Sequence, residues 1–180
     1  MYKYQDFTIR NLQPSDYQII LNIIQAIRLE YGVIIPQEYD QDMQTYTAIE
    51  KYYLETGGLF WVVEKENKIL GTAAFYPYKA AEKGAEIKKI YLLPQARGKG
   101  LGKFLLHRLE LEIANRGFSS IWIKTINLFK EATSLYENSG YSKFIDIETP
   151  KNGYIYCKNI SNQNPENCIF TPKPINQKIL

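Results

Sequence analysis

The feature of this sequence that most constrains its fold is a glycine-rich loop between a strand-like and a helix-like segment. The loop spans residues 97–102 and reads Arg-Gly-Lys-Gly-Leu-Gly. Before it, residues 86–93 form a strand-like segment that ends at Pro94, whose nitrogen has no hydrogen to donate to a sheet. After it, apolar side chains recur at three- and four-residue steps until Gly117 ends the pattern. The sequence therefore predicts a strand, a tight loop and an amphipathic helix in succession.

A loop of this kind at a helix N-terminus is suited to bind phosphate. Unpaired backbone N–H groups and the helix dipole attract anions there. Glycine lets the anion approach the main chain and tolerates positive φ, and the basic side chains add positive charge. The residues expected to contact the anion are Arg97, Gly98, Lys99, Gly100, Leu101, Gly102 and Lys103.

The spacing of the glycines excludes two common phosphate motifs. A Walker P-loop needs a glycine five residues before its Gly-Lys pair and a Ser or Thr after it, but Arg97 and Phe104 occupy those positions. A dinucleotide-binding loop needs a glycine three residues after Gly100, where Lys103 stands. Neither motif fits the chain.

Composition limits the remaining possibilities. The chain has 180 residues, of which 45% are hydrophobic, enough for one domain, which we place at residues 1–158 with a polar tail at 159–180. A net charge of +3, from 22 basic and 19 acidic residues, is too balanced to favour nucleic-acid binding. Two cysteines and one histidine show no metal-ligand spacing, so no metal is expected. With no signal peptide and no apolar run of about 20 residues, we expect a cytoplasmic protein without a membrane contact.

Hydrophobic periodicity predicts the other elements. A helix with Ser15 as its N-cap should end near Gly32, and a second helix should occupy about 40–55. Strands are expected at 8–10, 59–64, 69–76, 86–93, 121–123, 141–147 and 153–158, and further helices at 101–116 and 129–139.

Two segments together resemble the GNAT superfamily of acyl-CoA-dependent N-acetyltransferases. Arg97, Gly100 and Gly102 match the Arg-x-x-Gly-x-Gly pattern of that family, after the strand end Ile90-Tyr91-Leu92-Leu93-Pro94. Residues 132–141 read Ala-Thr-Ser-Leu-Tyr-Glu-Asn-Ser-Gly-Tyr, similar to a later family segment, Ala-x-x-Leu-Tyr-Glu-x-x-Gly-Phe. The resemblance implies an α/β fold in three layers, with a mixed, mostly antiparallel sheet of six to seven strands and about four helices. The strands at 86–93 and 121–123 would splay apart.

The same resemblance implies roles for single residues. Acetyl-CoA would be the co-substrate, and its pantetheine arm would contact Ile90, Tyr91 and Leu92, with Asn127 as a further contact. The Leu92 N–H would stabilise the oxyanion. Tyr136 would be the general acid, and Glu86 the general base, directly or through water. Histidine 107 is expected at the surface.

The acceptor is left open between a small-molecule amine and a protein or peptide amine, and a homodimer is also left open. Tyrosines at 39, 46, 52, 53, 76 and 78 could line an aromatic pocket for a cationic amine or serve in packing. A non-catalytic module that binds acyl-CoA as a sensor or structural partner is the alternative to an enzyme.

Overall fold

The computed structural model describes residues 1–35, 40–144 and 152–160. Within them, one sheet of eight strands has the order β1-β2-β3-β4-β5-β6-β8-β7. Only β5 and β6 pair in parallel, and the other neighbours are antiparallel. The strands are β1 Tyr2–Tyr4, β2 Phe7–Asn11, β3 Leu59–Lys65, β4 Lys68–Tyr78, β5 Gly84–Leu92, β6 Ser120–Ile126, β7 Ser142–Phe144 and β8 Gly153–Asn159.

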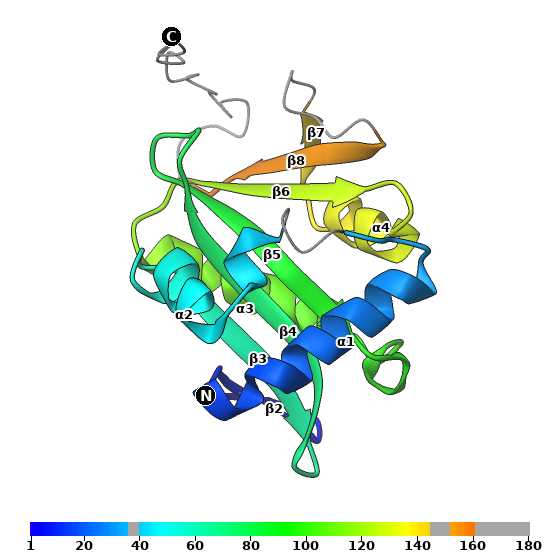
Figure 1. Cartoon of the computed structure of the whole chain (residues 1–180). Helices are drawn as coiled ribbons and strands as arrows, with labels where there is room; N and C mark the ends of the chain where they lie inside the picture. Colours follow the sequence, from blue (N-terminus) through cyan, green and yellow to red (C-terminus); the bar gives the residue numbers. More distant parts are fainter. Residues whose placement is uncertain (36–39, 145–151, 161–180) are drawn as a thin grey trace, which may run out of the picture.

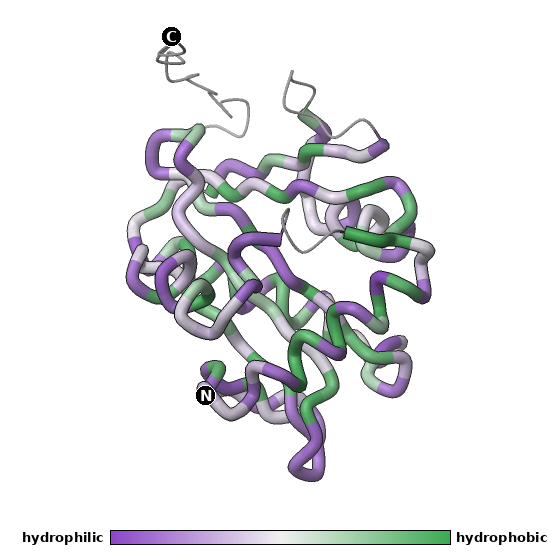
Figure 2. Tube along the Cα trace, in the orientation of Figure 1, coloured by the Kyte–Doolittle hydropathy of each residue, from purple (hydrophilic) through white to green (hydrophobic). Residues whose placement is uncertain are grey.

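Helices cover both faces of this sheet (Figure 1). Helices α1 (Tyr17–Glu30) and α2 (Tyr46–Ile49) lie on one face, and α3 (Leu101–Asn115) and α4 (Lys130–Asn138) lie on the other. Along α1, hydrophobic and hydrophilic positions alternate as the amphipathic pattern predicts (Figure 2). Each face therefore has its own apolar core, one built around Ile24 and Phe60 and the other around Leu105 and Ile123. The predicted three-layer α/β fold is confirmed.

A β-bulge in β5 reverses the expected direction of one side chain. Thr72 pairs with Tyr91 and Ala74 with Lys88, so β5 holds one more residue than β4 over this stretch. Lys89 adopts a positive φ of 58° and its carbonyl accepts a hydrogen bond from the Thr72 hydroxyl, with 2.6 Å between the oxygens. As a result Lys88 and Lys89 both lie on the α1 side of the sheet, next to acidic side chains of residues 40–42.

The two parallel strands β5 and β6 separate along their length. Their pairing runs from Gly84 with Ser120 to Glu86 with Trp122 and does not continue toward Leu92 and Ile126. Figure 1 shows them running apart toward α4. The predicted splay of these strands is present.

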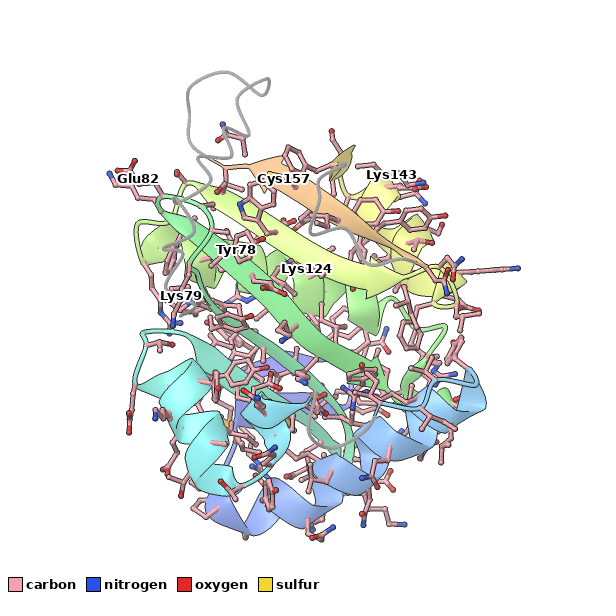
Figure 3. All side chains as sticks on the ribbon, turned by 45° about the horizontal axis from the view of Figure 1, so that its top comes forward. Tyr78, Lys79, Glu82, Lys124, Lys143 and Cys157 are labelled. Atoms are coloured by element: carbon pink, nitrogen blue, oxygen red, sulfur yellow. The ribbon has the colours of Figure 1, made fainter. Side chains whose placement is uncertain are left out.

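An aromatic cluster closes the paired end of these strands. Tyr78, Trp122 and Phe144 pack together there, with ring centroids 5.4 Å apart for the first pair and 5.3 Å for the second. The ammonium group of Lys124 lies 5.1 Å from the centre of the Tyr78 ring (Figure 3).

Several local expectations differ from the structure. Ser15 is not the N-cap, because a 3-10 helix, Pro14–Asp16, precedes α1. The Asp16 carboxylate instead accepts the Gln13 N–H at 2.8 Å. Strand β1, Tyr-Lys-Tyr, is only three residues long, too short for a clear periodic pattern, and it is an eighth strand where six to seven were expected.

The second predicted helix is divided into three short pieces. A 3-10 helix, Gln41–Met43, precedes α2, and a π-helical turn, Glu50–Leu54, follows it. Residues 145–147 of one predicted strand and tail residues 161–180 lie outside the described part of the chain. No described helix has both the length and the apolar character that a membrane span requires.

Candidate active site

A cavity of about 560 Å³ occupies the gap between the splayed strands. Its walls come from the C-terminal half of α1, from β5 and the glycine-rich loop, and from β6 and α4. Of the residues predicted to form the site, those that line the cavity are Ile90, Tyr91, Leu92, Arg97, Gly98, Gly100, Leu101, Gly102 and Tyr136. The fold thus brings together most of the predicted site.

The glycines of the loop serve different purposes. Gly98 and Gly100 have positive φ values of 71° and 76°, a conformation that favours glycine. Nothing lies within 4 Å of a Cβ added at Gly98, whereas one at Gly100 would lie 2.6 Å from the Tyr4 hydroxyl oxygen. At Gly102 such a Cβ would contact Leu135 and Leu92, beside the cavity. Gly100 therefore has a second constraint that the sequence did not indicate, because a side chain there would meet Tyr4.

Tyr4 supports the loop from its outer side. Its hydroxyl donates to the Lys99 carbonyl at 2.9 Å, and its ring lies 4.6 Å from that of Phe104. Sequence reasoning missed this contact, because no pattern in the short polar β1 segment connects it to a loop far along the chain.

Arg97 joins three parts of the site. Its Nε donates to the Leu92 carbonyl at 2.7 Å, and its two terminal nitrogens bind both carboxylate oxygens of Glu30 at 2.6 and 2.8 Å. The guanidinium also lies 5.8 Å from the centre of the Tyr31 ring. A hydrogen-bonded carboxylate on α1 therefore competes with any anion for this arginine.

The register of β5 determines which backbone groups face the gap. Leu93 donates to the Leu70 carbonyl at 2.8 Å and therefore pairs with β4. Because alternate residues of a strand direct their N–H groups to opposite sides, the Leu92 N–H points toward β6. At this level β6 has already separated from β5.

Tyr136 lies on α4, where the apolar face of the helix meets the cavity. Its side chain is buried and packs against Tyr141 and Tyr156. No hydrogen bond joins its hydroxyl to another residue of the described chain, although the residue lines the cavity. Burial, with a smaller effect from Tyr91, raises the pKa of Tyr136 above its usual value of about 10. The phenol is therefore protonated at neutral pH.

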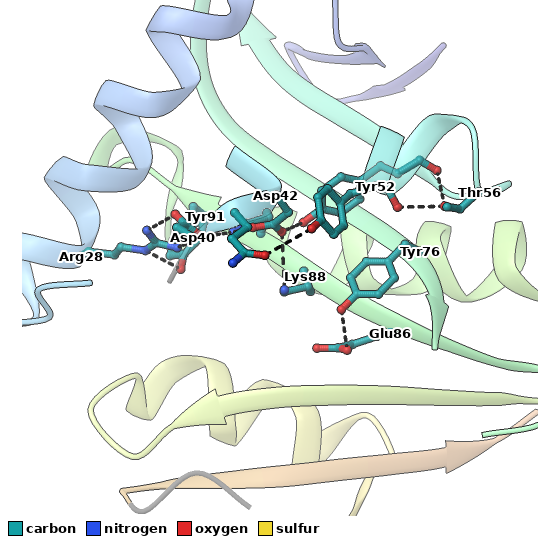
Figure 4. A network of polar contacts seen from close by, with 12 residues as sticks. Arg28, Asp40, Asp42, Tyr52, Thr56, Tyr76, Glu86, Lys88 and Tyr91 are labelled. Carbon is teal, nitrogen blue, oxygen red and sulfur yellow. Dashed lines mark hydrogen bonds and ion pairs between the residues drawn. The ribbon is translucent and has the colours of Figure 1, made fainter. Parts of the chain in front are cut away.

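Glu86 is buried beside the lining residues Ile87 and Lys88, but it does not itself line the cavity. Its carboxylate accepts a hydrogen bond from the Tyr76 hydroxyl at 2.9 Å (Figure 4). Burial, and then the Glu86 charge, raise the pKa of Tyr76, so this phenol remains the donor. Glu86 can receive a proton from a group in the cavity only by a short relay or a small movement.

Three other predicted contacts lie away from the cavity lining. The side chains of Lys99 and Lys103 are exposed at the start of α3, and Lys99 lies 5.4 Å from the centre of the Phe7 ring. Asn127 is exposed after β6, where its N–H donates to the Asn152 carbonyl. His107 is exposed on α3, as predicted.

A buried ion cluster in the wall of the cavity was not predicted. Asp40 binds Arg28 at 2.6 Å (Figure 4). It also binds Lys89 at 2.7 Å, and Asp42 binds Lys89 at 3.2 Å. Burial lowers the pKa of Lys89, against the opposing charges of Asp42 and Asp40. In the sequence, only the two adjacent lysines of this strand hint at the cluster. Adjacent side chains of a regular strand point to opposite faces, and the bulge is what brings both lysines to one face.

Comparison with known proteins places this site in context. The model of the acetyltransferase (GNAT) family matches residues 20–141. An uncharacterized N-acetyltransferase of Escherichia coli, YjgM, is 30% identical over 155 residues, which cover 86% of this chain and 92% of the relative.

Solved structures agree on the fold. A Streptococcus agalactiae acetyltransferase superposes with a TM-score of 0.76 at 24% identity, covering 87% of this chain and all of the other. A GNAT phosphinothricin acetyltransferase of Sinorhizobium meliloti, solved with acetyl-CoA, gives a TM-score of 0.69 at 18% identity, covering 92% and 96%.

Proposed function

Because this chain belongs to the GNAT family of acetyltransferases, we propose that it moves the acetyl group of acetyl-CoA to a primary amine by direct attack of that amine. Membership identifies an acetyl-CoA-dependent N-acetyltransferase. The acceptor and the roles of single residues are our proposal. The observation that carries it is that Tyr136 and the glycine-rich loop line one cavity between the splayed strands.

The loop and β5 would hold the acetyl donor. Backbone N–H groups at the start of α3 suit the pyrophosphate, because Gly98 and Gly100 adopt the positive φ that shapes an anion-binding turn. Backbone groups of Ile90 and Leu92 would receive the pantetheine arm as an added strand. The Leu92 N–H, directed into the gap, would stabilise negative charge on the carbonyl oxygen.

Proton transfer completes the reaction. A bond forms between the amine nitrogen and the thioester carbon, and the bond from that carbon to sulfur breaks. Tyr136 would give its proton to the departing sulfur, and Glu86 would accept the proton lost by the amine, directly or through water. No side chain needs to form a covalent bond with the acetyl group.

The direct test follows release of the free CoA thiol from acetyl-CoA across a panel of amines, amino acids and peptides. We expect at least one class of acceptor to be active. No release with any acceptor, together with intact CoA binding in calorimetry, would support a non-catalytic acyl-CoA-binding module instead.

A second test concerns the general acid. Tyr136→Phe should lower kcat about a hundredfold with little change in CoA affinity, because only the proton donor is lost. Since burial raises the pKa of Tyr136, kcat of the wild type should show no decline from phenol ionisation below about pH 10. Tyr52→Phe, on an exposed residue outside the cavity, is the matched control. Equal kcat for Tyr136→Phe and Tyr52→Phe would remove Tyr136 from the mechanism.

A further inference from the structure

The ion cluster beside the cavity carries more positive than negative charge. It contains the labelled residues Arg28, Lys88, Asp40 and Asp42 of Figure 4, together with Lys89, which makes three cations and two carboxylates. Four of the five also belong to the cavity wall, Asp42 being the exception. These five residues therefore carry a net charge of +1, and the carboxylate beside them on β5, Glu86, does not itself line the cavity.

The two carboxylates are fully engaged within the cluster. Asp40 accepts hydrogen bonds from Arg28 at 2.6 Å and from Lys89 at 2.7 Å. Asp42 accepts from Lys89 at 3.2 Å and from the Tyr53 hydroxyl. A cationic acceptor that approached these carboxylates would have to displace a buried lysine or arginine. The cluster is thus poorly suited to attract an ammonium group.

Of the three cations, Lys88 is the one whose N–H donors can bind a substrate. Its ammonium nitrogen lies 3.5 Å from an Asp42 oxygen, and it makes no hydrogen bond within the described part of the chain. Arg28 and Lys89, in contrast, each hydrogen-bond to Asp40, and their side chains are less than a tenth exposed. The Lys88 side chain is 32% exposed and its nitrogen lies 5.3 Å from the centre of the Tyr76 ring.

Glu86 lies beside this cation on the same face of β5. The two residues are two positions apart in a regular part of the strand, which separates their Cα atoms by about 6.6 Å. Tyr76 contacts both, because its hydroxyl donates to Glu86 at 2.9 Å while its ring lies below Lys88. Lys88 lies in the cavity wall and Glu86 lies buried behind it, within reach through a short relay or a small movement. An ammonium group in the wall with a carboxylate beside it suits a small zwitterion.

We propose that the acceptor is an amino acid with a free carboxylate, which the Lys88 ammonium group binds while the amine lies on the Glu86 side. This inference rests on the proposed function and names its substrate class. One surplus charge is balanced by a monoanionic carboxylate, whereas a dianionic phosphate would leave an uncompensated negative charge. Lys88 determines specificity and takes no part in the proton transfers.

The experiment measures kcat/KM with matched pairs of acceptors that differ only in the carboxylate. Suitable pairs are L-lysine with cadaverine, L-phenylalanine with phenethylamine, and L-methionine with 3-(methylthio)propylamine. For the active pairs we expect kcat/KM to be at least about tenfold higher for the amino acid than for the amine. A difference of this size corresponds to one charge-assisted hydrogen bond. An equal or higher kcat/KM for the amines would overturn the inference but would leave the acetyltransferase proposal standing.

Variants then connect the preference to Lys88. Lys88→Met should abolish the preference by raising KM for the amino acid alone, and Lys88→Arg should restore part of it. Lys68→Met, at the exposed first residue of β4, is the control for loss of one lysine charge. Thermal unfolding and CoA affinity verify the folded state, and the wild-type pairs remain a complete test if Lys88→Met does not fold. A preference that persists in folded Lys88→Met would exclude Lys88 as the carboxylate anchor.

Discussion

At the scale of single residues, Gly98 and Gly100 offer an internal comparison within one loop. Both have nearly the same left-handed backbone conformation, with φ of 71° and 76°. They differ in surroundings, since an added methyl group meets open space at Gly98 and the Tyr4 hydroxyl at Gly100. Substitution by alanine therefore separates the cost of backbone strain from the cost of losing the Tyr4 contact.

We expect Gly98→Ala and Gly100→Ala each to lose about 1 kcal/mol of folding free energy from the left-handed conformation. Gly100→Ala should lose more, because the methyl group displaces Tyr4 from its hydrogen bond to Lys99. The loosened loop should also bind CoA more weakly, by about fivefold relative to Gly98→Ala. Denaturant unfolding and calorimetric titration with CoA measure the two effects.

Tyr4→Phe provides the matched control for this comparison. It removes the hydrogen bond to Lys99 at 2.9 Å and keeps the ring contact with Phe104. If Tyr4 supports the loop, Tyr4→Phe should reproduce the loss of CoA affinity without the backbone cost. Identical CoA affinities for Gly98→Ala, Gly100→Ala and Tyr4→Phe would refute a role for Tyr4.

At the scale of elements, the last turn of α1 connects the two halves of the site. Glu30 pairs with Arg97 at the proposed cofactor end, while Arg28 pairs with Asp40 at the proposed acceptor end. Tyr31 follows directly and donates its hydroxyl to Glu131 on α4 at 3.2 Å. The end of α1 with its C-cap residue thus contacts the glycine-rich loop, the ion cluster and the helix that carries Tyr136.

Replacing Glu30 tests this connection. Glu30→Gln removes a negative charge that competes for Arg97 and repels a pyrophosphate, so CoA should bind more tightly, by about threefold at low salt. The gain should shrink as salt is added. Glu82→Gln, the same change on an exposed loop, should leave the affinity unchanged. Weaker binding by Glu30→Gln would show instead that Glu30 orients Arg97 for the cofactor.

The sequence predicts elements that depend on neighbouring residues, but not contacts that depend on tertiary pairing. The glycine-rich loop and α3 were predictable, because positive φ, helix start and apolar periodicity are all encoded within 20 or so neighbouring residues. The hydrogen bond from Tyr4 to Lys99 joins residues 95 positions apart, and no local pattern announces it. Lys89 reached the acidic cluster only because β4 and β5 pair with a bulge. Contacts of this kind depend on tertiary pairing.

At the scale of the whole molecule, the ion cluster fastens one layer to the next. Arg28 comes from α1, Asp40 and Asp42 from the segment before α2, and Lys89 from the central strand β5. Burial alone would raise the pKa of Asp40, but the hydrogen bond from Arg28 and the charge of Lys89 outweigh it and hold that pKa below its usual range. Asp16 has a lowered pKa for similar reasons: burial opposes the shift, and Arg10 and the Gln13 N–H overcome it.

Carboxyl groups with lowered pKa values, such as Asp16 and Asp40, are expected to contribute to the acid stability of the fold. A carboxyl group whose pKa is lower in the folded than in the unfolded chain stabilises the fold above the unfolded pKa, near 4. That contribution is lost as the pH falls from about 4 through the folded pKa. The free energy of unfolding should therefore be insensitive to the titration of Asp16 and Asp40 between pH 5 and 8 and should decrease below about pH 4.

Asp40→Asn should lower the free energy of unfolding at pH 7 by about 3 kcal/mol, because Arg28 and Lys89 lose their shared counter-charge. The variant should also lose less stability than the wild type between pH 5 and 3. In the wild type the unfolded chain takes up a proton at Asp40 in this range, which favours unfolding, and Asp40→Asn removes that carboxyl group. Denaturant unfolding at a series of pH values measures both effects, with Glu82→Gln as the control. If the free energies of unfolding of the wild type and Asp40→Asn decreased in parallel below about pH 5, the cluster would not couple folding to protonation. Apolar packing would then hold α1 to β5.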